Sequence, residues 1–375
     1  MRSRIAIDIY PLCNPRAGIG RSVHGLMQTL PQLCDEQDLE LVPFLRQMLG
    51  SNRDLGISAF RPVRIRMPRF AEKWISRLGL VEVMTRARLF HATDFYLPLR
   101  HRSPMIASVY DVIYATDPEG TVDHVRLARA MSYRAGQCIR VITCSEYSAR
   151  EFCGLYGYPR ERVTVIPLGI DTHHFRPGLR EPLSPGYFLA VSCNDRRKNT
   201  PRLVRAFINY ARAGGLSDLK LAWNLPDSLA REIQASGMAN RIVALGKVPE
   251  PELLELYQGA RCVMFPSLQE GFGFPVLEAL ACGVPVLTTR RSSLPEVGGD
   301  LAIYVDGEDE EEITREMLAL DTGSYLPLAE RVRREGPQWA SHFNWRRYAE
   351  NTLAVYQSAL EELSNKPWRP LVLHR

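Results

Sequence analysis

Phe265-Pro-Ser-Leu-Gln-Glu-Gly-Phe-Gly-Phe-Pro-Val-Leu-Glu-Ala-Leu-Ala-Cys-Gly-Val-Pro-Val-Leu287 has the pattern of a strand, a loop, a short helix and a second strand. The first apolar run ends at Phe265, and the loop continues to Phe274. Pro275 suits the first position of a helix, and Gly283 suits the position just past its end. We therefore predict a helix of about two turns over 275–281.

The same alternation of short apolar runs and helices continues on both sides of this segment. Strands are predicted at 5–10, 39–44, 105–110, 139–144, 163–166, 187–192, 220–223, 242–245, 262–265, 284–288 and 302–305. Helices are predicted at 122–134, 145–156, 200–213 and 252–257, among others. Buried parallel strands separated by helices are typical of a doubly wound α/β fold.

A segment rich in proline and glycine, 167–186, divides the chain and is predicted to be a linker. We expect one doubly wound domain over 1–175, a second over 176–342, and an amphipathic helix within 343–375. Two such domains facing a central cleft would place ligands beyond the carboxyl ends of their strands.

Composition narrows the class of protein. The chain has 375 residues, 45% hydrophobic and 24% charged, which is ordinary for globular domains. It lacks an apolar run of about 18 residues, and Asp8 interrupts the first apolar stretch, so neither a membrane helix nor a signal peptide is predicted. None of the eight cysteines forms a C-x-x-C pair, which favours buried reduced thiols. We expect a cytoplasmic protein.

The formal charge of +5 is unevenly distributed. Residues 42–102 carry twelve Lys or Arg against four Asp or Glu. A basic face of this kind can meet anionic lipid, nucleic acid or an acidic substrate, or can simply be solvated. The acidic run 306–312 is interpreted as a solvated helix start rather than a metal site.

The loop before the predicted helix has the chemistry of an anion site. The N-terminus of a helix presents backbone N–H groups and partial positive charge, and Gly271 and Gly273 leave room for a ligand to approach. Glu278, expected in the first helical turn, could accept hydrogen bonds from ribose hydroxyls, and Glu270 could reach the other end of the ligand. The alternative is that both carboxylates only cap and charge a helix start.

Several motifs together resemble the retaining GT-B glycosyltransferases, specifically glycosyltransferase family 4. The central one is Glu270-x₇-Glu278 within Gln-Glu-Gly-Phe-Gly-Phe-Pro-Val-Leu-Glu-Ala. The others are Ala17-Gly-Ile-Gly-Arg21, Ser145-Glu-Tyr-Ser-Ala-Arg150, Ile166-Pro-Leu-Gly-Ile-Asp171, Arg197-Lys-Asn199 and Phe343-Asn-Trp-Arg-Arg-Tyr-Ala349. The resemblance covers nearly the whole chain and implies two Rossmann-like domains, the first on the acceptor side and the second binding a nucleotide sugar. It also implies a C-terminal helix that crosses back to the first domain.

The resemblance assigns roles to residues of the second domain. It implies that Glu270 faces the donor sugar, Glu278 holds the ribose, and Lys198 binds the diphosphate. Relatives often have an arginine where this chain has Ser192, so Arg196 or Arg197 could substitute for it. The remaining donor-binding residues implied are Gly271, Phe272, Gly273 and Phe274 of the loop, and Gly18 and Gly20 of the first glycine loop.

One position departs from the family pattern. Relatives often have His-Asp after a first-domain strand, whereas this chain has Tyr110-Asp111. Asp111 is retained as a site residue. Tyr110 could contact the sugar through its hydroxyl or could be buried.

The implied reaction is transfer of a sugar with retention at the anomeric carbon. No strand is followed by an Asp-x-Asp pair, so no essential metal is expected, and no cofactor is expected. A GDP-linked mannose or rhamnose is the first choice of donor and a UDP-sugar the second, with a glycan or lipid-linked glycan acceptor at the inner face of the plasma membrane. A GT-B epimerase or phosphorylase and a nucleotide- or nucleic-acid-binding module are the alternatives. We expect no nucleic-acid partner, and the spacing of Gly18 and Gly20 disfavours an NAD dehydrogenase.

Overall fold

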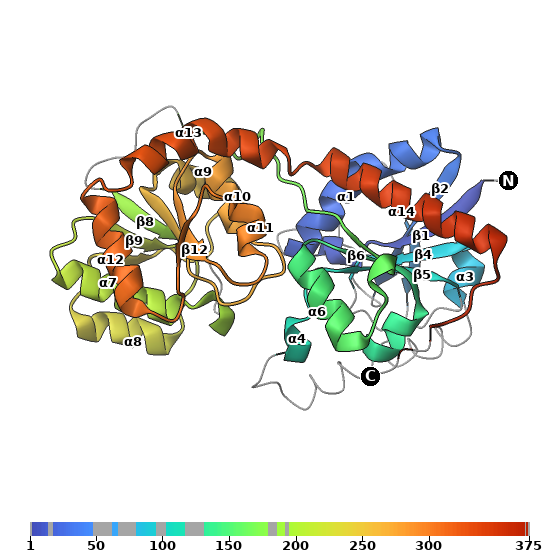
Figure 1. Cartoon of the computed structure of the whole chain (residues 1–375), viewed down its shortest axis with the longest axis horizontal. Coiled ribbons are helices and arrows are strands. Elements are labelled where there is room, and N and C mark those ends of the chain that lie inside the picture. The colour runs from blue at the N-terminus through green and yellow to red at the C-terminus, as the bar shows by residue number, and fades with distance from the viewer. Residues whose placement is uncertain are drawn as a thin grey trace. The chain divides into compact units, whose positions relative to one another are not determined.

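A computed structural model describes residues 2–13, 18–47, 62–66, 80–94, 103–116, 131–178, 186–191, 195–371 and 373. The chain forms two compact units. The first comprises Met1–Gly169 together with Trp345–Arg375, and the second comprises Ile170–Asn344. Each unit is a parallel α/β sheet with helices on its faces, which confirms the doubly wound class predicted from the alternation of apolar runs (Figure 1).

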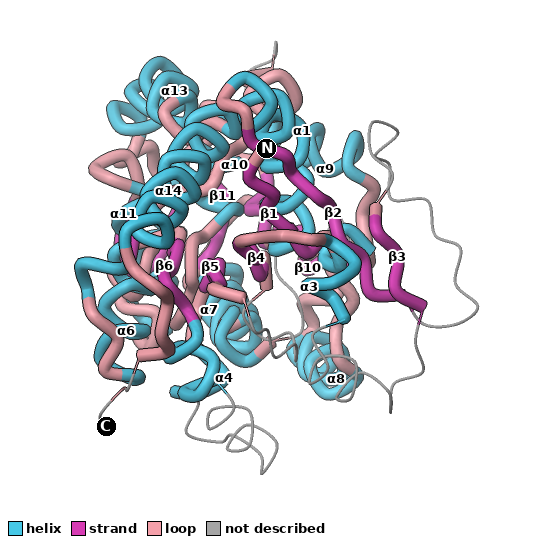
Figure 2. The backbone as a smooth tube through the Cα atoms, turned by 90° about the vertical axis from the view of Figure 1, so that its right-hand side faces the viewer, coloured by secondary structure: helices cyan, strands magenta, loops and turns pink. Residues whose placement is uncertain are grey.

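The first unit contains a seven-stranded sheet in the order β3-β2-β1-β4-β5-β6-β7. Its strands are β1 Ser3–Asp8, β2 Leu39–Gln47, β3 Val63–Arg66, β4 Leu89–Ala92, β5 Met105–Val109, β6 Cys138–Thr143 and β7 Val163–Val165. Figure 2 shows β2, β1, β4, β5 and β6 side by side. The short strands β3 and β4 were not predicted, and most of the predicted helix 122–134 lies outside the described residues.

Helices from both ends of the chain cover this sheet. They are α1 Gly18–Glu36, α3 Leu80–Thr85, α4 Ile113–Thr116, α6 Glu146–Tyr156 and α14 Trp345–Asn365. The C-terminal helix α14 packs along α1 (Figure 1). Gly25 makes this contact close, because a Cβ atom there would lie 2.2 Å from the Trp345 ring.

The second unit contains a six-stranded sheet in the order β10-β9-β8-β11-β12-β13. Its strands are β8 Tyr187–Ala190, β9 Asp218–Leu221, β10 Ile242–Ala244, β11 Cys262–Phe265, β12 Val286–Thr289 and β13 Ile303–Val305. Its helices are α7 Thr200–Arg212, α8 Asp227–Ser236, α9 Glu250–Gly259, α10 Phe274–Ala281, α11 Leu294–Gly298, α12 Glu310–Asp321 and α13 Leu326–Ser341. Helices α7, α8 and α12 gather on one face of the sheet, and α9, α10, α11 and α13 on the other (Figure 1).

The strand order of the second sheet indicates where its ligand site is expected. The chain starts in the middle of the second sheet with β8, moves outward to β10, and returns beside β8 with β11. Ligands of doubly wound sheets bind where the strand order reverses in this way, outside the carboxyl ends of the strands. The loops that follow β8 and β11 therefore form the expected site of the second unit.

Two further predictions can be compared with the structure. Seven cysteines are free thiols, buried or half-buried, as predicted, and Cys193 lies outside the described residues. The acidic run 306–312 contains the start of α12, where the Asp309 side chain accepts from the Glu312 N–H, as expected for a helix start. Among the described residues, no helix is both long and apolar enough to cross a bilayer.

Candidate donor site

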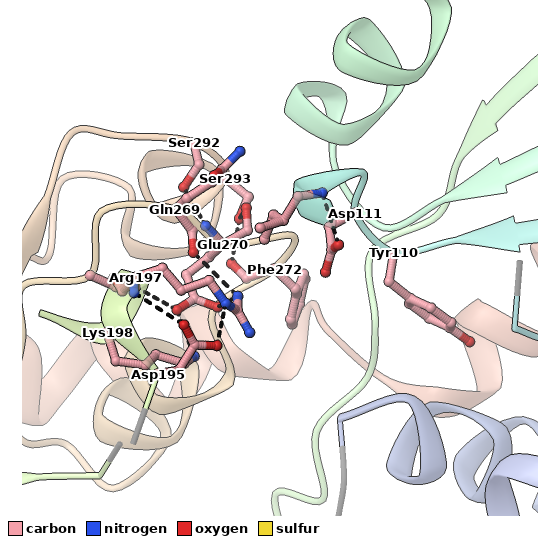
Figure 3. A network of polar contacts seen from close by, with 12 residues as sticks. Tyr110, Asp111, Asp195, Arg197, Lys198, Gln269, Glu270, Phe272, Ser292 and Ser293 are labelled. Atoms are coloured by element: carbon pink, nitrogen blue, oxygen red, sulfur yellow. Dashed lines mark hydrogen bonds and ion pairs between the residues drawn. The ribbon is translucent and has the colours of Figure 1, made fainter. Parts of the chain in front are cut away.

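Glu270 lies in the loop after β11 and is 6% exposed. Its Oε1 accepts hydrogen bonds from Lys198 Nζ and from the Ser267 hydroxyl, each at 2.6 Å. The Arg197 guanidinium lies 3.5 Å from Oε2. The structure thus brings together three residues predicted for the site, Glu270, Lys198 and Arg197, around one nearly buried carboxylate (Figure 3).

Lys198 reaches Glu270 because a short 3₁₀ turn after β8, Arg196–Lys198, is fixed at both ends. The Asp195 side chain accepts from the Arg197 N–H at the start of the turn. Asn199 ends the turn with a φ of 61° and donates from its side-chain amide to the carbonyls of Pro266 and Gly307. The turn is therefore tied to the loop after β11, and the Lys198 ammonium also lies 4.9 Å from the centre of the Phe265 ring.

Arg196 and Arg197 have different surroundings. Arg197 donates to the Gln269 carbonyl at 3.3 Å and pairs with Asp195, so it belongs to the Glu270 cluster. Arg196 is exposed and lines a hollow of about 60 Å³ together with Trp223 and other side chains from α7 and the loop after β9. Ser192, where the family resemblance implies an arginine, lies outside the described residues.

Glu278 departs from its predicted place. The helix begins at Phe274, so Glu278 is its fifth residue and lies beyond the first turn. Its side chain is 2% exposed, and Oε2 accepts a hydrogen bond from the Tyr257 hydroxyl of α9 at 2.6 Å. The buried Tyr257 hydroxyl holds this carboxylate in one orientation. A carboxylate that only caps or charges the start of a helix needs no such partner.

The glycine loop before α10 is well defined. Gly273 has a φ of 112°, in the region that favours glycine, and immediately precedes the helix. Phe272 is buried against Phe274 and Phe343, while Gly271 and Gly273 flank it in the loop. The loop backbone also contacts Ser292 and Ser293, which follow β12. Sequence reasoning missed these serines and Ser267, although each follows a predicted strand at its carboxyl end.

In the first unit, Tyr110 and Asp111 follow β5 and point in different directions (Figure 3). The Tyr110 hydroxyl faces Ser22 and Tyr348 inside the unit, and burial raises the pKa of Tyr110 well above its usual value. The hydroxyl is therefore directed into the first unit, while the residue as a whole is half-buried. The Asp111 carboxylate accepts from the Ile113 N–H at 3.2 Å.

Gly18 and Gly20 are not part of a loop that precedes a helix. Both lie in the first turn of α1, and residues 14–17 before them are outside the described residues. The prediction of a glycine turn up to residue 20 was wrong at this point, because helical structure already begins at Gly18. Gly20 is buried within that turn.

Among the described residues, no cluster of three or more His, Cys, Asp or Glu side chains is arranged to hold a metal ion. The positive charge beside Glu270 comes instead from Lys198 and Arg197.

Two doubly wound units in one chain match the GT-B fold of solved glycosyltransferases. Two family models match the chain, Glycosyltransferase Family 4 over residues 17–174 and Glycosyl transferases group 1 over residues 188–322. The chain therefore contains a Glycosyltransferase Family 4 domain and a Glycosyl transferases group 1 domain, as its sequence motifs predicted.

Individual proteins are similar to the chain in sequence or in fold. The O-antigen chain mannosyltransferase B of Escherichia coli is 28% identical over 293 residues, covering 72% of this chain and 74% of that protein. A glycosyltransferase from Rickettsia africae has the same fold, with a TM-score of 0.71 and 14% identity over 96% of this chain and 99% of that one. HepE from Anabaena, solved with UDP and glucose, has a TM-score of 0.65 and 15% identity over 98% of this chain and 100% of that one.

Proposed function

We propose that the chain is a retaining hexosyltransferase that takes mannose or rhamnose from a GDP-linked donor. The acceptor proposed is a glycan, free or lipid-linked, in the synthesis of a surface polysaccharide such as O-antigen, capsule or exopolysaccharide. The similarity to an O-antigen chain mannosyltransferase supports this choice. A UDP-linked glucose or N-acetylhexosamine is the second candidate, supported by the fold shared with HepE, which was solved with UDP and glucose.

The observation that carries the proposal is the nearly buried Glu270 carboxylate held by Lys198 at the carboxyl end of β11. In the proposed complex Glu270 contacts the transferred sugar, and Lys198 and Arg197 bind the diphosphate together with the amides of 271–274. These groups supply the positive charge that stabilises the leaving diphosphate, so the proposed reaction needs no metal ion or cofactor. Glu278 accepts hydrogen bonds from the ribose hydroxyls.

The proposed chemistry is a substitution at the anomeric carbon. The acceptor hydroxyl forms the new C–O bond on the face from which the diphosphate leaves, and a diphosphate oxygen takes the hydroxyl proton. This order of events retains the anomeric configuration. Asp111 of the first unit is proposed as a further site residue, and Arg197 rather than Arg196 is proposed to replace the arginine that relatives have at position 192.

The decisive experiment compares two carboxylates of the second unit. Donors are first screened by thermal shift with GDP-, UDP-, ADP- and dTDP-sugars, because a ligand that binds the folded chain raises its stability. With the donor that shifts, we expect Glu270→Gln to lower kcat/KM by about a hundredfold or more. Glu310→Gln, which also breaks an ion pair, with Arg205 at 2.7 Å, should keep near wild-type activity. Equal activity in the two variants would contradict the proposal.

We further propose that the first unit docks on an anionic membrane surface, with the protein otherwise cytoplasmic. Most of the basic segment 42–102 lies outside the described residues, but its described part supports the idea. Val83 and Met84 of α3 are 68% and 48% exposed, and exposed Arg86 and Arg88 follow them. Apolar side chains beside cations suit an anionic interface. Failure to sediment with anionic vesicles at low salt would rule this out.

A further inference from the structure

The loop that carries Glu270 lies against the two consecutive serines that follow β12. Ser293 is fully buried, and its hydroxyl donates to two carbonyls of the loop, Glu270 O at 3.0 Å and Phe272 O at 2.9 Å. The Ser292 hydroxyl accepts from the Glu270 N–H at 2.9 Å. Figure 3 shows both serines on one side of the loop, with Arg197 and Lys198 on the other.

These contacts fix how the peptide groups of the loop face. The peptide bond is planar and trans, so its C=O and N–H point in opposite directions. Because Ser293 holds the carbonyls of Glu270 and Phe272, the N–H groups of Gly271 and Gly273 are turned away from Ser293. Two amides directed to the same side of a glycine loop can donate to anionic or hydroxyl oxygen atoms of a ligand.

The peptide before Glu270 faces the opposite way. Its N–H points to Ser292, and its carbonyl, from Gln269, accepts from Arg197. The Glu270 backbone is therefore fixed on both sides, which directs its carboxylate to Lys198. A side chain does not fit at Gly273, because a Cβ atom there would lie 2.8 Å from the Leu294 side chain.

Ser292 adopts a strained conformation to make its contact. Its φ is 54°, in the left-handed region that residues with a side chain rarely occupy. Backbone strain of this kind persists where the surrounding structure enforces it, and it concentrates at functional sites. Here the strain coincides with a hydrogen bond to the residue that carries the proposed sugar contact.

We propose that Ser293, assisted by Ser292, is a positioning residue of the donor site. Its buried hydroxyl orients the amides of Gly271 and Gly273 toward the sugar and diphosphate of the donor, while Glu270 is held toward Lys198. The inference rests on the proposed function, because it names which part of a nucleotide sugar these amides meet. Ser293 itself does not contact the donor.

The test is calorimetric binding to the full chain with two probes, GDP-mannose and GMP, or UDP-glucose and UMP if the wild type prefers uridine. The monophosphate lacks the transferred sugar and the phosphate attached to it, so it keeps only one of the groups that the loop is proposed to meet. We expect Ser293→Ala to weaken binding of the sugar nucleotide about tenfold and to change monophosphate binding by less than about twofold. Retained monophosphate binding also shows that the variant is folded.

Ser217→Ala is the matched control. Ser217 is also a fully buried serine of the second unit, and its hydroxyl donates to Asp321 at 2.8 Å. It lies just before β9, at the amino ends of the strands, whereas the candidate site lies at their carboxyl ends. The Ser217→Ala variant should bind both probes as the wild type does.

Ser292→Gly is a second variant, because glycine accepts the φ of 54° and only the hydroxyl is lost. It should show the same selective weakening, by about threefold.

One result would contradict the positioning role of Ser293, and another would contradict the proposed function. If the wild type binds a sugar nucleotide and Ser293→Ala binds it equally well, or loses both probes to the same extent, the positioning role is wrong while the proposed function stands. If the wild type binds none of the sugar nucleotides, the proposed function fails, and the ligand assigned to these amides fails with it.

Discussion

At the scale of single residues, Tyr257 holds Glu278, the carboxylate proposed to bind the ribose, in one orientation. The Tyr257 side chain is fully buried, and its hydroxyl donates to the Glu278 carboxylate at 2.6 Å. Phe175 packs edge-on against the Tyr257 ring, which limits its movement. A carboxylate oriented before the ligand arrives loses less conformational entropy on binding.

Tyr257→Phe should therefore impair donor binding more than catalysis. The variant removes a hydrogen bond to a charged group, and we expect donor KM to rise about fivefold with kcat nearly unchanged. Tyr210→Phe is the control, because Tyr210 is equally buried in the same unit but donates to Asp321 instead. Steady-state kinetics with the donor varied would decide. A fall in kcat without a change in KM would show that Tyr257 acts in some other way.

The sequence is informative about these residues to different degrees. Glu270 and Glu278 were predicted because they lie in one local pattern of strand, glycine loop and helix. Tyr257 and Ser293 were not, because their partners come from other elements and no local period records such contacts. Tyr110 illustrates a further limit, since only the positions of Ser22 and Tyr348 show which way its hydroxyl points.

At the scale of elements, local patterns predicted uninterrupted apolar strands and amphipathic helices well and interrupted apolar runs poorly. Runs such as β11 and α7 have several buried residues at a regular spacing, and their bounds were predicted to within about one residue. The strands β3 and β4 are four residues each, as β11 is, but β3 alternates apolar residues with arginine and β4 contains a histidine, so neither is an uninterrupted apolar run. The amphipathic pattern of α14 predicted a helix, while its contact with α1 depends on residues more than 300 positions away.

The contact between α1 and α14 depends on one missing side chain, at Gly25. A Cβ there would meet the Trp345 ring at 2.2 Å, so Gly25→Ala should force the helices apart and lower the free energy of unfolding by about 2 kcal/mol or more. Gly154→Ala in α6 is the control, because no atom lies within 4 Å of the added Cβ. It should be neutral or stabilising by up to about 1 kcal/mol. Urea denaturation of both variants would test this, and equal stabilities would contradict it.

At the scale of the whole molecule, the first unit is built from two segments of the chain that flank the second unit in the sequence. The chain leaves the first unit after Gly169, forms the second over Ile170–Asn344, and returns with α14. The returning helix is joined to the first sheet by polar contacts as well as by apolar packing. His91 of β4 lies between Tyr356 of α14, at 2.6 Å, and Ser108 of β5, at 2.9 Å.

This buried histidine makes the stability of the first unit depend on pH. Burial lowers the pKa of His91 to about 3 from its ordinary value of 6.5. Between these values the unfolded chain takes up a proton that the folded chain excludes, so stability is fully present above pH 6.5 and falls as the pH is lowered toward 3. The free energy of unfolding then falls by up to about 1.4 kcal/mol per pH unit within that window.

His91→Gln, which cannot titrate, should be less stable at pH 7.5 but should lose less stability between pH 7.5 and 5. Hydrogen exchange of amides in β1, β4 and β5 at both pH values would measure this, and equal pH dependence in wild type and variant would show that His91 is not the group responsible.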